Sequence, residues 1–167
     1  MIIPIHGVDE LPQGPYAGSS VFVWTADEMR ISLRLGDLDR LGCLFESVEL
    51  KPIPGARLDV DPYSLGQKLG YLGEPLVVIE QAKEQGRAML RSSPPSVDAT
   101  HNYFFELTVD RDEGLSLIRY AYDRIGRERK MIAAPLTTHA LGQLIDDLKR
   151  LSVNESRDVP SRQRAVI

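Results

Sequence analysis

Residues 29–35 alternate strictly between apolar and polar side chains, and this pattern constrains the fold more than any other feature of the sequence. The apolar residues occupy every second position from Met29 to Leu35, with Arg30, Ser32 and Arg34 between them. In an extended chain, successive side chains point to opposite faces. The pattern therefore predicts a strand that buries one face and exposes the other to water.

Seven further segments are strand-like. They are residues 21–25, 43–50, 76–81, 88–92, 103–109, 115–123 and 128–134. The first of them is expected to pair with residues 29–35 as an antiparallel hairpin, and the last three are expected to form a meander. A helix over residues 77–91 competes with the two strands there, although Val77, Val78 and Ile79 favour a strand.

Apolar residues recur at helical spacing only near the end of the chain. Leu141, Leu144, Ile145, Leu148 and Leu151 would line one face of a helix. Thr137 or Thr138 is suited to begin it, because a threonine hydroxyl can accept a hydrogen bond from a free N–H of the first turn. This pattern predicts one amphipathic helix that covers a face of the sheet.

The fold class predicted from these patterns is α+β, with about eight mostly antiparallel strands in a curved sheet or partial barrel and one C-terminal helix. Glycines and prolines punctuate residues 52–75, which are expected to form a loop with at most a short helix over 63–72. The 167 residues fit one domain, predicted to span residues 1–151. Residues 152–167 are polar and aperiodic and are expected to form a mobile tail.

The location expected from the sequence is the cytoplasm. Cys43 is the only cysteine, so no disulfide can form within the chain, and residues 1–7 carry no signal-peptide pattern. Uninterrupted aliphatic runs are far shorter than the roughly 20 residues of a membrane span. We therefore expect a soluble protein without membrane association.

No motif for catalysis, a metal or a cofactor is visible. The three histidines, His6, His101 and His139, are far apart in the sequence, and residues 66–73 are glycine-rich without a phosphate-binding signature. Neither Cys43 nor any serine lies in a nucleophile motif. We predict no metal and no cofactor, and we favour a non-enzyme.

Tyrosines and arginines gather in residues 119–127, and these two residue types are enriched in protein interfaces. Tyr120 and Tyr122 share one face of the predicted strand and Arg119 lies on the other, while Arg124 and Arg127 flank the turn. Residues 114–131 contain five basic and two acidic side chains, although the whole chain carries a net charge of −4. The leading hypothesis is a non-catalytic domain that binds another protein through this hairpin; an ordinary sheet surface is the competing interpretation.

A second hypothesis places a small-molecule site, or an enzyme site, in the mouth of the curved sheet. His101, Tyr103 and Arg119 would be among its polar lining. His101 would then be the candidate general base. The acidic net charge makes nucleic acid an unfavoured partner, and the sequence leaves the oligomeric state open.

Overall fold

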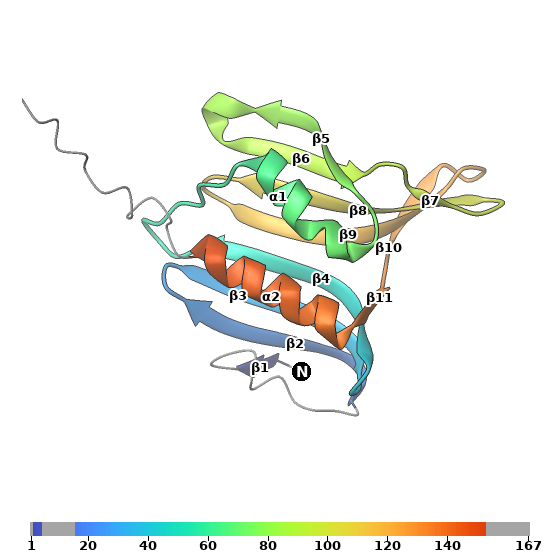
Figure 1. Cartoon of the computed structure of the whole chain (residues 1–167), viewed down its shortest axis with the longest axis horizontal. Helices are drawn as coiled ribbons and strands as arrows, with labels where there is room; N and C mark the ends of the chain where they lie inside the picture. Colours follow the sequence, from blue (N-terminus) through green and yellow to red (C-terminus); the bar gives the residue numbers. More distant parts are fainter. Residues whose placement is uncertain (1, 5–15, 153–167) are drawn as a thin grey trace, which may run out of the picture.

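The computed structural model describes residues 2–4 and 16–152, which form one open, curved sheet with two α-helices (Figure 1). Its strands are β1 (Ile2–Pro4), β2 (Tyr16–Ala26), β3 (Met29–Leu38), β4 (Gly42–Pro52), β5 (Leu76–Ala82), β6 (Arg87–Ser92), β7 (Ser96–Val97), β8 (His101–Asp110), β9 (Gly114–Asp123), β10 (Glu128–Ile132) and β11 (Ala134–Thr137). The α-helices are α1 (Pro62–Lys68) and α2 (Thr138–Ser152), with short 3-10 turns η2 (Leu69–Leu72) and η3 (Lys83–Gln85). The predicted α+β class is confirmed.

The strand order across the sheet is β1, β2, β3, β4, β9, β8, β6, β5. Among the strands of the described residues, only β1 pairs in parallel, with β2. The remaining neighbours are antiparallel, as the short connections predicted. Because the order ends at β1 and β5, which do not pair with each other, the sheet does not close into a barrel.

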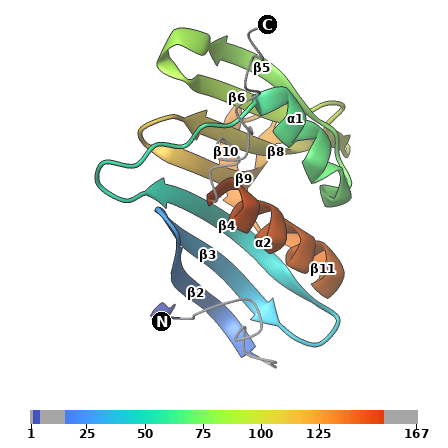
Figure 2. The same ribbon diagram turned by 60° about the vertical axis from the view of Figure 1, so that its left-hand side comes forward.

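The alternation of β3 places Ile31 and Leu33 in the core, opposite Leu50 and Val48 of β4. Helix α2 packs over this side of the sheet (Figure 2). Its start is as predicted, since the Ala140 N–H donates to the Thr137 hydroxyl at 3.1 Å. The apolar face that the sequence indicated is thus buried against the sheet.

Helix α1 covers the other half of the same sheet face and contacts β5 and β6. The carboxylate of Asp61 begins this helix by accepting from the Ser64 N–H at 3.3 Å. The short helix expected over 63–72 is thus α1 followed by η2. We call the sheet face under α1 and α2 the inner face, and the opposite one the outer face.

The sheet order runs through eight strands, and the short strands β7, β10 and β11 pair beside it. The short strands β1 and β7 lack enough residues for a periodic pattern. The predicted strand 128–134 is divided between β10, which pairs with β9, and the start of β11, which pairs with β4. The competing helix over 77–91 was wrong, because β5 and β6 pair there as a hairpin.

Two further expectations concern the ends of the chain and the membrane. Ser152 is the last residue of α2, and the rest of the predicted tail lies outside the described residues. Within residues 2–4 and 16–152, no helix combines the length and apolar character needed to cross a membrane.

Candidate functional site

The turn between β9 and β10 is built by one carboxylate. Asp123 accepts from the Ile125 N–H at 2.9 Å through its side chain, and its backbone carbonyl accepts from the Arg127 N–H at 2.8 Å. Hydrogen bonds from the N–H groups of Gly126 and Ile125 lower the pKa of Asp123. The backbone of Arg127 has a φ of 57°, in the left-handed region that few non-glycine residues adopt.

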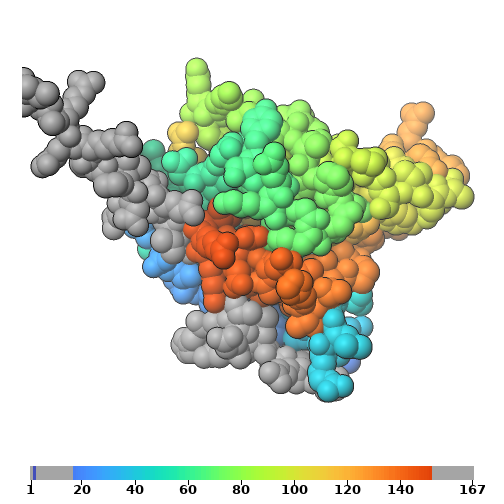
Figure 3. Space-filling model, in the orientation of Figure 1, coloured from blue at the N-terminus to red at the C-terminus, as the bar shows by residue number. Residues whose placement is uncertain are grey.

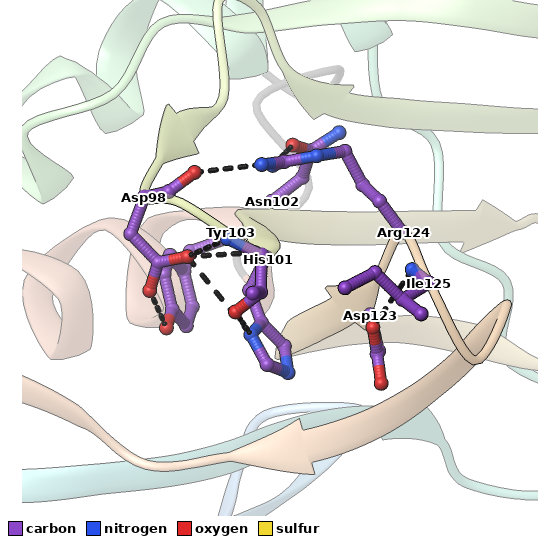
Figure 4. Close-up of polar contacts among 8 residues, drawn as sticks. Asp98, His101, Asn102, Tyr103, Asp123, Arg124 and Ile125 are labelled. Carbon is purple, nitrogen blue, oxygen red and sulfur yellow. Dashed lines mark hydrogen bonds and ion pairs between the residues drawn. The ribbon is translucent and has the colours of Figure 1, made fainter.

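A second carboxylate organises the neighbouring loop between β7 and β8 (Figure 4). Asp98 accepts from the N–H groups of Thr100 and His101 at 2.8 and 2.7 Å, and from the Tyr103 hydroxyl at 2.6 Å. These donors, led by Tyr103, hold the pKa of Asp98 well below its usual value. The loop is therefore fixed by an ionised aspartate.

Arg124 joins this loop to the β9–β10 turn. Its guanidinium donates to the side-chain oxygen of Asn102 and to the backbone carbonyl of Asp98, both at 2.7 Å. The backbone N–H of Arg124 donates to the Thr100 carbonyl at 2.9 Å. Turn and loop are thus held together, and they project from one end of the molecule (Figure 3). Arg124 is engaged within the chain, whereas the Arg127 side chain is exposed.

His101 does not have the arrangement of a catalytic relay. Its Nδ1 atom lies 2.6 Å from the Thr100 hydroxyl and 3.9 Å from a carboxylate oxygen of Asp98. A base that passes a proton between a nucleophile and a carboxylate uses both ring nitrogens. Because both contacts fall on the same nitrogen, the ring is positioned as a loop element, stacked on Tyr103 at 6.0 Å between ring centroids.

Arg119 points to the inner face and is separated from the other arginines of the hairpin. It donates to Glu74 at 2.7 Å and lies over the ring of Phe105. Glu74 also accepts from the hydroxyls of Ser92 and Ser96 at 2.5 and 2.8 Å. The side chain of Arg119 is only 16% exposed, so this arginine is committed to the interior.

A different set of charged and aromatic groups occupies the outer face. Glu106 accepts from Arg91 at 2.8 Å and from Arg129 at 3.2 Å. Arg91 lies over the ring of Phe104 at 4.9 Å, and Arg129 lies over the ring of Tyr120 at 4.3 Å. The two rings are themselves 5.9 Å apart, so five side chains form one cluster, which we call the outer cluster.

Tyr122 and Met131 lie next to the outer cluster. The register pairs Arg129 with Tyr122 and Met131 with Tyr120, so all four side chains lie on the outer face. Tyr122 is partly buried, and Met131 is 64% exposed. The predicted sharing of one face by Tyr120 and Tyr122, with Arg119 opposite, agrees with this register.

On the inner face, the surroundings of Arg119 combine a packed interior with a nearby groove. His101, Tyr103 and Arg119 do lie on the same face by register, but the adjoining interior is filled by Phe105, which is fully buried together with leucines of β6, β8 and β9. A groove of about 620 Å³ lies between α1 and β5, and its lining includes Glu74, the ion-pair partner of Arg119, but not His101, Tyr103 or Arg119. The small-molecule hypothesis for His101, Tyr103 and Arg119 stays a prediction.

Sequence reasoning missed the carboxylates that hold the site together. Glu74 lies in a glycine- and proline-rich stretch, and Glu106 lies inside an otherwise apolar strand segment. A charged residue within such a segment is a signal for a buried ion pair, because an unpaired charge there would be costly. The pairing of Glu106 with Arg91 could not be deduced, since the sequence does not specify that β6 lies next to β8.

The described residues contain no cluster of His, Cys, Asp and Glu side chains arranged to hold a metal ion. Comparison of the chain with protein-family models, with curated proteins and with solved structures found no match.

Proposed function

We propose that this chain is a non-catalytic protein-binding domain that contacts its partner through the β9–β10 hairpin. The contact surface comprises Tyr120, Tyr122, Arg129 and Met131 on the outer face and the turn 124–127. We call it the hairpin surface. The observation that carries the proposal is the outer cluster, which presents arginines already stacked on aromatic rings on a sheet face that neither helix covers.

The burial of Phe104 supports a distinct role for this face. Phe104 is 8% exposed, yet it does not belong to the core cluster that includes its neighbour Phe105. It is shielded by contacts with Arg91 and Tyr120 on the outer face. Aromatic rings and arginines that are packed at a surface provide large contact areas and directional hydrogen bonds to a partner.

The hairpin surface is also held in place before any partner binds. Arg124 ties the turn to the β7–β8 loop, and Arg129 is fixed between Glu106 and Tyr120. Ordering flexible side chains on binding costs roughly 0.5–1.5 kcal/mol for each of them. A surface that the fold has already ordered avoids much of this cost.

The positive charge of the hairpin is separated from the acidic residues near the start of the chain. Asp27 and Glu28 lie in the turn between β2 and β3, at the end of the molecule opposite the β9–β10 turn (Figure 1). Asp9 and Glu10 lie outside the described residues. Within the described part of the chain, the hairpin therefore keeps a positive character that favours an acidic partner.

Affinity purification with paired variants tests this proposal. The tagged full-length chain would be used as bait in a lysate of its source cells, at low and at moderate salt, and bound proteins would be quantified by mass spectrometry. The Tyr122→Ala/Arg127→Ala variant should lose a stoichiometric partner at least tenfold. Arg127 is chosen in place of Arg124 because Arg124 also holds the β7–β8 loop.

The matched control is Tyr63→Ala/Arg57→Ala, which removes the same two residue types at exposed positions outside the hairpin. It should keep the partner. Thermal unfolding of both variants should match that of the parent chain within a few degrees. Equal retention of the partner by the two variants, or no stoichiometric partner at either salt concentration, would overturn the proposal.

A further inference from the structure

Strand β10 has one free edge. Within the described residues it pairs only with β9, and the backbone hydrogen bonds outside regular pairing include none from residues 128–132. In an edge strand, every second residue directs its N–H and C=O away from the paired neighbour. An unpaired edge of this kind is a template for a further strand.

Along β10, the acidic Glu128 is followed by two basic residues and then by two apolar ones. Arg129 and Lys130 are adjacent, so they point to opposite faces, and both are exposed. Met131 and Ile132 follow, again on opposite faces. Exposed Arg127 adds a further positive charge next to the strand.

From this edge we infer that the partner supplies an extended acidic segment that adds to β10 as an antiparallel strand. The inference rests on the proposed function and specifies the partner's chemistry. Opposite charges directly across two paired strands stabilise the pair. The segment that fits best has two adjacent apolar residues, opposite Ile132 and Met131, followed by two adjacent acidic residues, opposite Lys130 and Arg129.

The same charges argue against a second copy of this chain as the occupant. Pairing two β10 strands antiparallel about Lys130 would place the two Lys130 side chains directly opposite each other. Like charges in that position are destabilising. Strand β5, at one end of the sheet order, has no comparable positive stretch, because its seven residues include one acidic and no basic side chain.

The test uses a synthetic peptide with the core sequence Val-Val-Glu-Glu-Thr, titrated into the full-length chain labelled with ¹⁵N. We expect the largest amide shifts in residues 128–132, and an affinity that falls as salt is raised. A peptide with Lys in place of Glu should bind at least tenfold more weakly. The acidic peptide methylated on alternate backbone nitrogens should also lose at least tenfold, because it keeps the charge but cannot complete the ladder.

Three results would overturn the inference: no binding of the acidic peptide, shifts confined to other strands, or equal binding of the methylated peptide. In that case, self-association of an Arg129→Thr/Lys130→Thr variant would show that the two charges serve only to prevent β10 from pairing with other chains. The proposed function fails separately. Suppose that the Tyr122→Ala/Arg127→Ala variant loses a partner in the affinity purification but the peptide does not bind. The proposed protein-binding function then stands, and only the addition of a strand to β10 is refuted.

Discussion

Two buried glutamates on opposite faces of the same sheet use similar partners in different surroundings. Glu74 on the inner face pairs with Arg119, whose side chain is 16% exposed. Glu106 on the outer face pairs with Arg91 and Arg129, whose side chains are 39% and 49% exposed. The inner pair is closed off by the protein, whereas the outer arginines still reach solvent. The difference predicts a larger loss of stability when the inner pair is broken than when the outer one is broken.

The largest effect is expected for Glu74→Ala. This change leaves the Arg119 guanidinium charged and without its carboxylate, and it removes the acceptor for Ser92 and Ser96. Breaking a buried ion pair by removing one partner typically costs about 3–5 kcal/mol. Urea unfolding should show a loss of that size in the free energy of unfolding.

A double variant shows whether the loss of stability comes from the unpaired charge of Arg119 or from lost packing. Glu74→Leu combined with Arg119→Met replaces the pair by apolar side chains of similar size, and such replacements are often nearly neutral. The double variant should therefore recover most of the stability lost by Glu74→Ala. If it unfolds as readily as Glu74→Ala, the charge on Arg119 is not the cause of the loss.

A smaller loss is expected for Glu106→Ala. Arg91 and Arg129 are partly exposed, so both guanidinium groups can turn to water when the carboxylate is removed. The expected cost is about 1–3 kcal/mol, the range for removing one partner of a buried hydrogen bond. The same urea measurement applies. A loss equal to or above that of Glu74→Ala would show that the outer cluster is as closed as the inner network.

The sequence predicted the sheet far better than it predicted these two networks. Alternation in β3 and helical spacing in α2 follow directly from which side chains must be buried, so both could be found from local patterns. The meander of β8, β9 and β10 was also local, because its strands are consecutive. Strand order is different: β4 lies next to β9, and no local pattern encodes that long-range pairing.

The candidate site was predictable only in part, for the same reason. The alternation of Arg119, Tyr120 and Tyr122 gave their faces correctly, since side-chain direction depends on strand periodicity. The commitment of Arg119 to Glu74 could not be foreseen, because Glu74 lies in a loop 45 residues away. Likewise, the bond between Arg124 and Asn102 depends on how two separate turns meet.

The Arg129→Ala variant measures the contribution of one arginine to the stability of the outer cluster. It removes the cation over the Tyr120 ring and one of two arginine contacts to Glu106, while Arg91 still pairs with that carboxylate. Cation–π contacts at exposed sites contribute about 0.5–1 kcal/mol, and urea unfolding should show a loss of this order. Arg30→Ala, at an exposed position on β3, is the control and should change stability less. A loss above that of Glu106→Ala would mean that Arg129 has contacts of its own that hold the fold together.

The smallest effect concerns Asp98, an exposed carboxylate that contrasts with both buried ones. Hydrogen bonds from Tyr103, Thr100 and His101 lower its pKa in the folded chain, so the unfolded chain binds the proton more readily. The resulting stabilisation is fully present above about pH 4, the ordinary value for aspartate, and is lost as the pH falls through the lower folded-state pKa. The difference in urea midpoint between the parent chain and Asp98→Asn should therefore be largest near neutral pH and shrink below about pH 4. Asp59→Asn, at another exposed aspartate, should show no such narrowing. If the difference in urea midpoint between the parent chain and Asp98→Asn stays constant below about pH 4, the effect of the substitution comes from the shape of the loop. The charge of Asp98 would then contribute nothing to holding the hairpin surface in place.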